Sequence, residues 1–150
     1  MTRHDGRRMF FVDENLGEST AAALRILFRG SLFRTAKNLQ TRGLSDVNLL
    51  GRLSDEQFDG IITRDRKQLV HDDERVALRR AGLHWVGVDS FGSGRNAVSR
   101  MSPIRVRSAT MATLTLGLPL VLETWADRPT AYHLASRSVG RVDELSVHAI

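Results

Sequence analysis

The chain has 150 residues, a length that suits one domain with its own hydrophobic core and is short for two. It carries 22 lysine and arginine residues against 17 aspartate and glutamate residues, and the resulting charge of +5 favours an anionic partner such as nucleic acid. The absence of cysteine excludes disulfides, thiolate metal sites and thiol nucleophiles.

The N-terminus and one apolar segment bear on the location of the protein. The first residues, MTRHDGRRM, are charged and lack the hydrophobic stretch of a secretory signal, so we treat residues 1–8 as a basic tail and residues 9–150 as one domain. Residues 108–122 are uncharged but shorter than the roughly 20 residues that span a bilayer, and they contain Gly117 and Pro119. We expect a buried helix with a kink or break there, no membrane partner and a cytoplasmic location.

The first half of the chain alternates between strand and helix patterns. Residues 9–12, MFFV, form an apolar and aromatic run that ends in polar residues, as in a strand buried on both faces of a parallel sheet. From Leu16 the apolar residues recur at helical spacing, and Gly30 is placed as a C-terminal stop, which predicts a helix. A short strand over 31–36 and a polar loop follow.

The same alternation continues in the middle of the chain. A helix is predicted from Ser45 or Asp46, either of which can act as its N-cap, to about Phe58. Residues 60–63 form another short apolar strand, and a helix over 72–82 has acids in its first turn and arginines in its last, which complements the helix dipole.

The last third of the chain continues the pattern. A strand over 83–89 leads through a Gly/Ser-rich loop into the long apolar helix, which ends near Trp125, and a terminal strand and turn are predicted within 130–145. Strands that alternate with helices predict an α/β fold with a mainly parallel central sheet flanked by helices.

Acidic residues follow two of the predicted strands. Asp13 and Asp65 lie where ligands gather in parallel sheets, and Asp46 begins a helix that could reach the same edge. Crowded carboxylates repel one another, and a hard divalent ion such as Mg²⁺ or Mn²⁺ relieves that repulsion. Each acid also has a structural interpretation, as a helix cap for Asp13 and Asp46 and as a turn or ion-pair residue for Asp65. The combination of the three favours a metal site.

The remaining ionisable and aromatic residues are assigned no catalytic role. Asp72 and Asp73 are assigned to the helix dipole, and Asp89 either joins the acidic group or begins a turn. The Gly-Ser-Gly at 92–94 lacks the lysine and hydroxyl residue of a phosphate loop, and Trp85 and Trp125 are assigned to the core. None of the histidines form a pair at zinc-motif spacing; they are His4, His71, His84, His133 and His148.

Four segments together resemble a known family. FFVDENL, GLSD, GIITRDRKQ and ERVALRRAGLHWVGVD are similar, in order and spacing over residues 9–90, to the PIN-like domains of VapC-type toxins. The resemblance is to the subgroup whose first strand ends Asp-Glu-Asn and whose central strand ends Thr-Arg-Asp. It implies a PIN-like three-layer fold.

The resemblance also implies an activity. It implies a Mg²⁺- or Mn²⁺-dependent endoribonuclease that hydrolyses RNA phosphodiesters as the toxin of a type II toxin–antitoxin pair, with RNA, a cognate antitoxin and a second copy of the chain as partners. Carried over by position, Asp13, Asp46 and Asp65 are the catalytic and metal-binding acids, and Glu14 is a further metal ligand. The RNA-binding residues implied in this way are Asn15, Arg42, Arg64, Arg66 and Lys67.

Two departures from the superfamily leave alternatives open. A separate glutamate on a middle helix has no clear counterpart, and Lys67 stands where a further acid is common. One alternative is therefore a weakly active or inactive PIN-like module that binds RNA or an antitoxin. A phosphoacceptor domain of the receiver type, with Asp65 as acceptor, is disfavoured because the strand over 83–89 ends without the required lysine.

Overall fold

The computed structural model describes residues 6–39, 44–65, 67–90, 103–136 and 144–150. Within these residues, six strands form one sheet in the order β2-β1-β3-β4-β5-β6, and every neighbouring pair is parallel except β5 and β6, which are antiparallel. The strands are β1 (Arg8–Val12), β2 (Ser31–Arg34), β3 (Gly60–Thr63), β4 (His84–Ser90), β5 (Thr130–Ser136) and β6 (Glu144–Ala149).

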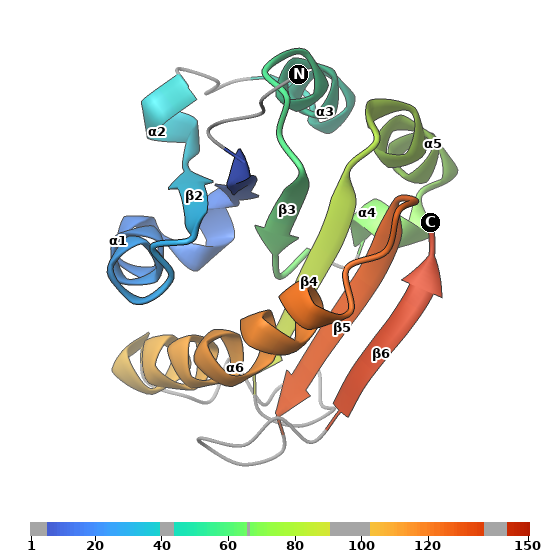
Figure 1. Cartoon of the computed structure of the whole chain (residues 1–150). Coiled ribbons are helices and arrows are strands. Elements are labelled where there is room, and N and C mark those ends of the chain that lie inside the picture. Colours follow the sequence, from blue (N-terminus) through green and yellow to red (C-terminus); the bar gives the residue numbers. More distant parts are fainter. Residues whose placement is uncertain (1–5, 40–43, 66, 91–102, 137–143) are drawn as a thin grey trace.

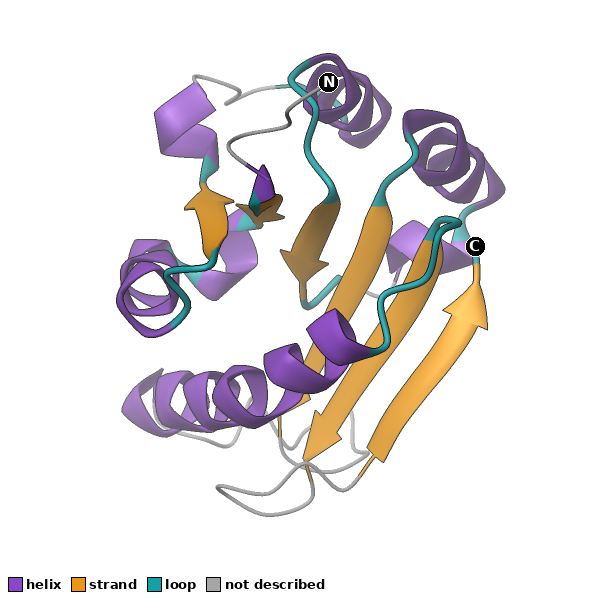
Figure 2. Cartoon of the chain, viewed as in Figure 1, coloured by secondary structure: helices purple, strands orange, loops and turns teal. Residues whose placement is uncertain are grey.

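Helices cover both faces of this sheet (Figures 1 and 2). The helices are η2, a 3-10 turn (Glu14–Leu16), α1 (Glu18–Leu27), α2 (Ala36–Leu39), α3 (Asp46–Asp55), α4 (Lys67–Val70), α5 (Asp72–Ala81) and α6 (Pro103–Glu123). Leu24 of α1 and Leu118 of α6 pack in one hydrophobic cluster with Phe10 of the sheet. Leu53 of α3 and Leu78 of α5 pack in a second cluster. The predicted α/β fold with three layers is confirmed.

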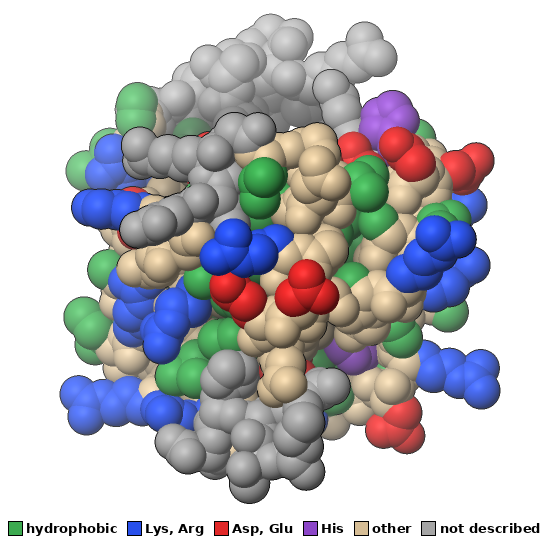
Figure 3. All heavy atoms as spheres, turned by 90° about the horizontal axis from the view of Figure 1, so that it is seen from above, with side chains coloured by type: hydrophobic (Ala, Val, Ile, Leu, Met, Phe, Trp, Pro, Cys, Tyr) green, Lys and Arg blue, Asp and Glu red, His purple; other side chains and the backbone are tan. Residues whose placement is uncertain are grey.

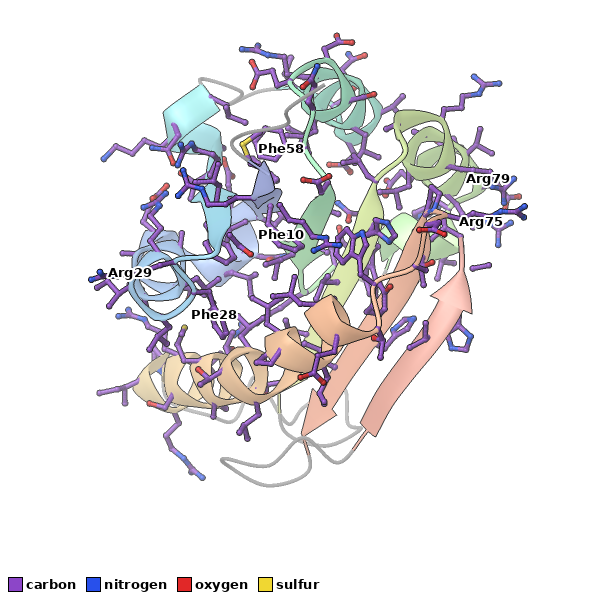
Figure 4. All side chains as sticks on the ribbon, in the orientation of Figure 1. Phe10, Phe28, Arg29, Phe58, Arg75 and Arg79 are labelled. Carbon is purple, nitrogen blue, oxygen red and sulfur yellow. The ribbon has the colours of Figure 1, made fainter. Side chains whose placement is uncertain are left out.

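β1 lies between the two hydrophobic clusters because alternate strand residues point to opposite faces. Phe10 and Val12 belong to the cluster beneath α1 and α6, whereas Phe11 belongs to the cluster beneath α3 and α5, and none of the three is exposed. Figure 4 shows Phe10 and Phe28 on the side of the sheet that α1 and α6 cover. A strand buried on both faces explains the unbroken apolar run in the sequence.

Several predicted boundaries change in the structure. The helix expected from Leu16 to Gly30 is divided into η2 and α1, because Gly17 between them adopts a φ of +84° that breaks the helix. Ser45, not Asp46, caps α3, and its side chain accepts a hydrogen bond from the Asn48 amide. Asp46 is thereby the first helical residue, and its carboxylate is not used as the cap.

The buried helix expected here is present as α6, which continues through Gly117 and Pro119, so of the expected kink or break the break is absent. A Cβ atom at position 117 would come within 2.7 Å of the Leu134 side chain, so this glycine lets α6 approach β5 closely. No helix in the described residues, α6 included, combines the length and apolar character needed to cross a membrane.

The ends of the domain also differ from expectation. The terminal strand expected within 130–145 is present as β5, the segment that follows it at 137–143 lies outside the described residues, and β6 was not predicted. Arg8, assigned to the basic tail, is the first residue of β1, and its guanidinium carbon lies 4.7 Å from the centre of the Trp125 ring. Trp125 is partly buried and Trp85 fully buried, as expected of core residues.

Candidate active site

β1 and β3 bring the two strand-following aspartates to one edge of the sheet. The strands run parallel with Val12 opposite Ile62, and the Asp13 amide continues the pairing by donating to the Ile62 carbonyl at 2.9 Å. The half-buried Asp13 also caps η2, because its Oδ1 accepts from the Glu14 amide at 2.8 Å. Asp13 therefore has the capping role considered from the sequence and also stands at the carboxyl edge.

Thr63, the last residue of β3, joins the residues of this edge. Its fully buried hydroxyl donates to Oδ2 of Asp13 at 2.7 Å. The hydroxyl oxygen of Thr63 also accepts from the Asp65 amide at 2.9 Å and from Nδ2 of Asn15 at 3.2 Å. Asn15 in turn accepts from the Arg64 amide through its Oδ1 at 3.3 Å. One hydroxyl thus uses its single proton and both lone pairs to connect the segments after β1 and β3.

The acids of this edge affect one another electrostatically. Burial is the main reason why the pKa of Asp13 lies above its ordinary value. Hydrogen bonds from Thr63 and from the Glu14 amide pull that pKa down, but the negative charges of Asp65 and Asp46 push it further up. The three aspartates singled out in the sequence therefore share one region of the structure.

Glu74, in the first turn of α5, is a fourth acid at this edge. Burial raises its pKa above the ordinary value, and the charge of Asp46, a side-chain hydrogen bond with Asp46 and the charge of Asp65 raise it further, against a smaller opposite effect of His71. A hydrogen bond between the Glu74 and Asp46 side chains requires a proton on one of the two carboxyl groups. The Oε2 atom of Glu74 is buried, and no hydrogen-bond partner for it occurs in the described residues.

The sequence analysis missed Glu74 because it lies in a run of three acids that suits a helix dipole. The structure separates these acids. Asp72 forms an ion pair with Arg75 at 2.8 Å, Asp73 lines a surface hollow between α3 and α5, and only Glu74 interacts with the acids of the edge. The available signal was position: Glu74 lies two residues after Asp72, so it faces a different side of the helix.

The donor chemistry of these acids suits Mg²⁺ or Mn²⁺, which prefer oxygen ligands. The proximity of Glu74 to Asp46 and the buried, unpartnered oxygen of Glu74 mark the place where a cation would relieve the repulsion between these acids. As the side chains stand, however, no group of three or more His, Cys, Asp or Glu residues in the described parts of the chain is arranged to hold a metal ion. Binding would therefore require the carboxylates to turn toward one another.

Arg64 lies at the edge but its side chain turns away from solvent. The guanidinium donates to the Thr110 hydroxyl of α6, its Nε is buried without a partner in the described residues, and burial lowers its pKa. Arg64 thus connects the end of β3 with α6. Arg42 and Arg66 lie outside the described residues, as do the side chains of Lys67 and Asp89.

A hollow of about 470 Å³ adjoins Asp13 on the side of β2. The residues that line it are Val12, Asp13, Glu14, Gly17, Glu18, Thr35, Ala36 and Lys37. Glu14 and Asn15 are exposed beside it. On the face shown in Figure 3, the basic and acidic side chains of the described residues form small separate groups and no continuous basic area.

A mainly parallel sheet whose carboxyl edge gathers aspartates and a glutamate is a nuclease-type α/β arrangement. Residues 9–90 match the family model described as PIN like domain. Because this match covers more than half of the chain, the protein belongs to the PIN-like domain family, whose members are generally nucleases. No curated protein and no solved structure matches the chain.

Proposed function

We propose that this protein is a metal-dependent endoribonuclease and the toxin of a type II toxin–antitoxin pair. The observation that carries the proposal is the hydrogen-bonded connection through Thr63, which holds Asp13 and the Asp65 backbone at one edge of a PIN-like domain. The pKa values of Asp13 and Glu74, which burial raises most and neighbouring acids raise further, support it because such carboxylates are common where a cation binds.

Asp13, Asp46 and Asp65 would hold Mg²⁺ or Mn²⁺, with Glu74 as the fourth acid and Glu14 as a further ligand. Bound there, the ion supplies an acidified water and neutralises charge on the leaving oxygen. The chain contributes orientation: Thr63 and the Glu14 amide fix both oxygens of Asp13, and Asn15 secures the turn at Arg64. In this proposal Glu74 is the counterpart of the middle-helix glutamate of the superfamily.

RNA cleavage in the presence of Mn²⁺ or Mg²⁺ tests the activity. We expect the wild type to cleave single-stranded RNA and Asp65→Asn to lose that cleavage. Asp55→Asn, which changes an exposed acid of α3 that lines a different hollow, serves as the matched control and should cleave like the wild type. Equal cleavage by Asp65→Asn and wild type would identify a contaminating nuclease and contradict the proposal.

The RNA-binding role is proposed for Asn15, Arg42, Arg66 and Lys67, with Arg34 and Lys37 nearby, whereas Arg64 would have to leave Thr110 before it could reach a phosphate. Cations that hold flanking phosphates release counterions, so affinity for an uncleaved RNA analogue should fall steeply as salt rises. Affinity that does not depend on salt would count against recognition of the RNA backbone.

The toxin role has its own test in cells. Expression of the chain alone should slow growth, and co-expression with a small neighbouring gene should restore it, if the partner places an arginine or lysine among the carboxylates. Harmless expression at a high level would argue against a toxin.

The second candidate function is a PIN-like module that binds RNA or an antitoxin without cleaving. The absence, in the described residues, of a group already arranged to hold a metal ion favours it. Calorimetric titration with Mn²⁺ separates the two candidates. Binding that Asp13→Asn abolishes supports the nuclease, and no binding by the folded wild type supports the inactive module.

A further inference from the structure

Antiparallel pairing of β5 and β6 brings two histidines together that are far apart in the sequence. The register places Ala131 opposite His148 and His133 opposite Ser146, so the two histidines are diagonal neighbours on one face of the sheet. Their ring centres are 5.5 Å apart and their planes are inclined by 73°. β6 is the last strand of the sheet, at the edge shown in red in Figure 1.

We infer that His133 and His148 form a binding site for a borderline transition metal ion such as Zn²⁺, Ni²⁺ or Cu²⁺, independent of the nuclease proposal. Metal–nitrogen bonds of about 2.0–2.1 Å place the ring centres of two imidazoles on one tetrahedral ion roughly 5 Å apart. The observed separation of 5.5 Å is close to that value, and the inclined rings suit two different coordination positions.

The surroundings of the two rings favour an accessible and ordered site. His148 is exposed, so an ion can approach from solvent, whereas His133 is half-buried. The ring of His133 packs against the fully buried Trp85, with 4.8 Å between ring centres. Trp85 is itself held by Gln68, which accepts from its indole nitrogen at 3.2 Å. A supported His133 needs little reorganisation to act as a ligand.

The donor atoms distinguish this site from the carboxylate edge, by which we mean the carboxyl ends of β1 and β3 with Asp13, Asp46, Asp65 and Glu74. Imidazole nitrogen suits zinc, copper and nickel, whereas Mg²⁺ and Mn²⁺ prefer oxygen. Because no group of three or more metal-ligating residues occurs in the described parts of the chain, water would complete the coordination and the ion would exchange readily. His133 is in register with Gly87, and Gly87 with Thr63, so His133 lies two strands, about 10 Å, from Thr63. His148 lies one strand further away.

Calorimetric titration with NiCl₂ in excess Mg²⁺ tests the inference, since Mg²⁺ occupies oxygen sites without competing for imidazole. We expect the wild type to bind one Ni²⁺ per chain and His148→Gln to bind at least about tenfold more weakly, because one of two ligands is lost. His71→Gln removes a histidine elsewhere and should bind like the wild type. Asp65→Asn should also retain Ni²⁺ binding, even if it abolishes RNA cleavage.

Fluorescence gives a second measurement that reports the location. Trp85 contacts His133, whereas Trp125 belongs to the hydrophobic cluster on the opposite face. Cu²⁺ should therefore quench part of the tryptophan emission of the wild type and not that of His148→Gln. No Ni²⁺ binding by the wild type, or equal binding and quenching in His148→Gln, would overturn the inference.

Discussion

The carboxylate edge and the two histidines of β5 and β6 differ in how their ionisable groups are held. At the edge, Asp13 is half-buried and Glu74 lies beside Asp46, and burial together with the neighbouring negative charges raises the pKa values of Asp13 and Glu74. His133 and His148 carry no negative charge, so a cation bound there would relieve no repulsion between carboxylates. Repulsion between carboxylates therefore acts among the acids that follow β1 and β3, and no such repulsion acts between the two histidines.

The two regions also differ in what surrounds them. Within the family match at 9–90, the acids are fixed through Thr63 by hydrogen bonds between strand ends. Outside that match, His133 is supported by ring packing on Trp85. Hydrogen bonds fix the direction of a side chain more strictly than packing does, so substitutions should disturb the two regions differently.

The largest loss of stability is expected for a substitution at Gly87, which lies against the buried Trp85 ring. A Cβ atom at Gly87 would lie 2.0 Å from the Trp85 ring, which is fully buried and cannot move freely. Gly87→Ala should lower the free energy of unfolding by about 3 kcal/mol through overpacking, measured by urea denaturation. Gly51→Ala, on exposed α3 with nothing within 4 Å of its Cβ position, is the control and should not destabilise. A stable Gly87→Ala variant would show that Trp85 is free to shift.

Removal of the Thr63 hydroxyl should have the next largest effect. In Thr63→Val the Asp65 amide loses its acceptor and Asp13 loses a donor, which should cost about 2 kcal/mol of stability. If the chain is a ribonuclease, cleavage should fall by about tenfold or more because Asp13 is no longer held in place.

Two variants sharpen this prediction. Thr63→Ser keeps the hydroxyl and should retain most of the activity. Thr113→Val removes another buried hydroxyl, whose bond goes only to the Ala109 carbonyl within α6, and should leave cleavage unchanged. Equal loss of cleavage in Thr63→Val and Thr113→Val would reduce Thr63 to a general structural role.

His84 gives a pH dependence that contrasts with the exposed His148. Burial lowers the pKa of His84 to about 4, with a smaller raising effect of Asp59 and a lowering effect of Arg8. Below about pH 6.5 the unfolded chain therefore takes up a proton that the folded chain refuses, and stability falls as the pH falls toward 4. We expect a loss of about 1–2 kcal/mol between pH 7 and pH 5.

Urea denaturation at several pH values measures this dependence. His84→Gln should flatten the slope between pH 7 and pH 5, whereas His148→Gln should keep it. An unchanged slope in His84→Gln would assign the pH dependence to other groups.

The smallest effect is expected for an exposed ion pair. Arg52 and Glu56 lie one helical turn apart on the surface, with 2.8 Å between Nε and Oε1. Glu56→Gln should cost no more than about 0.5 kcal/mol in the same denaturation experiment. A loss as large as that of Thr63→Val would mean that exposed charges matter here as much as the buried hydroxyl.

β1 and β3, which lead to the candidate active site, could be predicted from the sequence because each is a short apolar run between polar segments. β3 was predicted with its exact bounds, and the predicted strand over 9–12 differs from β1 by one residue. The buried helix expected around Gly117 and Pro119 is present as α6, but the sequence did not reveal that the glycine serves close packing on Leu134. β6 was missed although its residues, ELSVHA, alternate between polar and apolar, which is a strand signal that the sequence analysis overlooked.

The candidate site was predictable in part. The positions of Asp13 and Asp65 after two apolar runs placed them at one edge, and the structure brings Asp46 within electrostatic range of Asp13. Glu74 could not be separated from its acidic neighbours without knowing which side of α5 faces the sheet. His133 and His148 were dismissed because strand register, and not sequence spacing, places them together.

The hydrogen bonds around Thr63 have a fixed polarity, and this limits which residues can replace one another. The hydroxyl proton goes to Asp13, so Asn15 must present its amide hydrogens to Thr63 and its carbonyl oxygen to the Arg64 amide. An aspartate at position 15 would have no hydrogen to give Thr63 and would add a further charge beside Asp13. The side-chain amide of Asn15 thus donates to the Thr63 hydroxyl and accepts from the Arg64 amide. A substitution that reversed the direction of one of these hydrogen bonds would require a matching substitution at its partner.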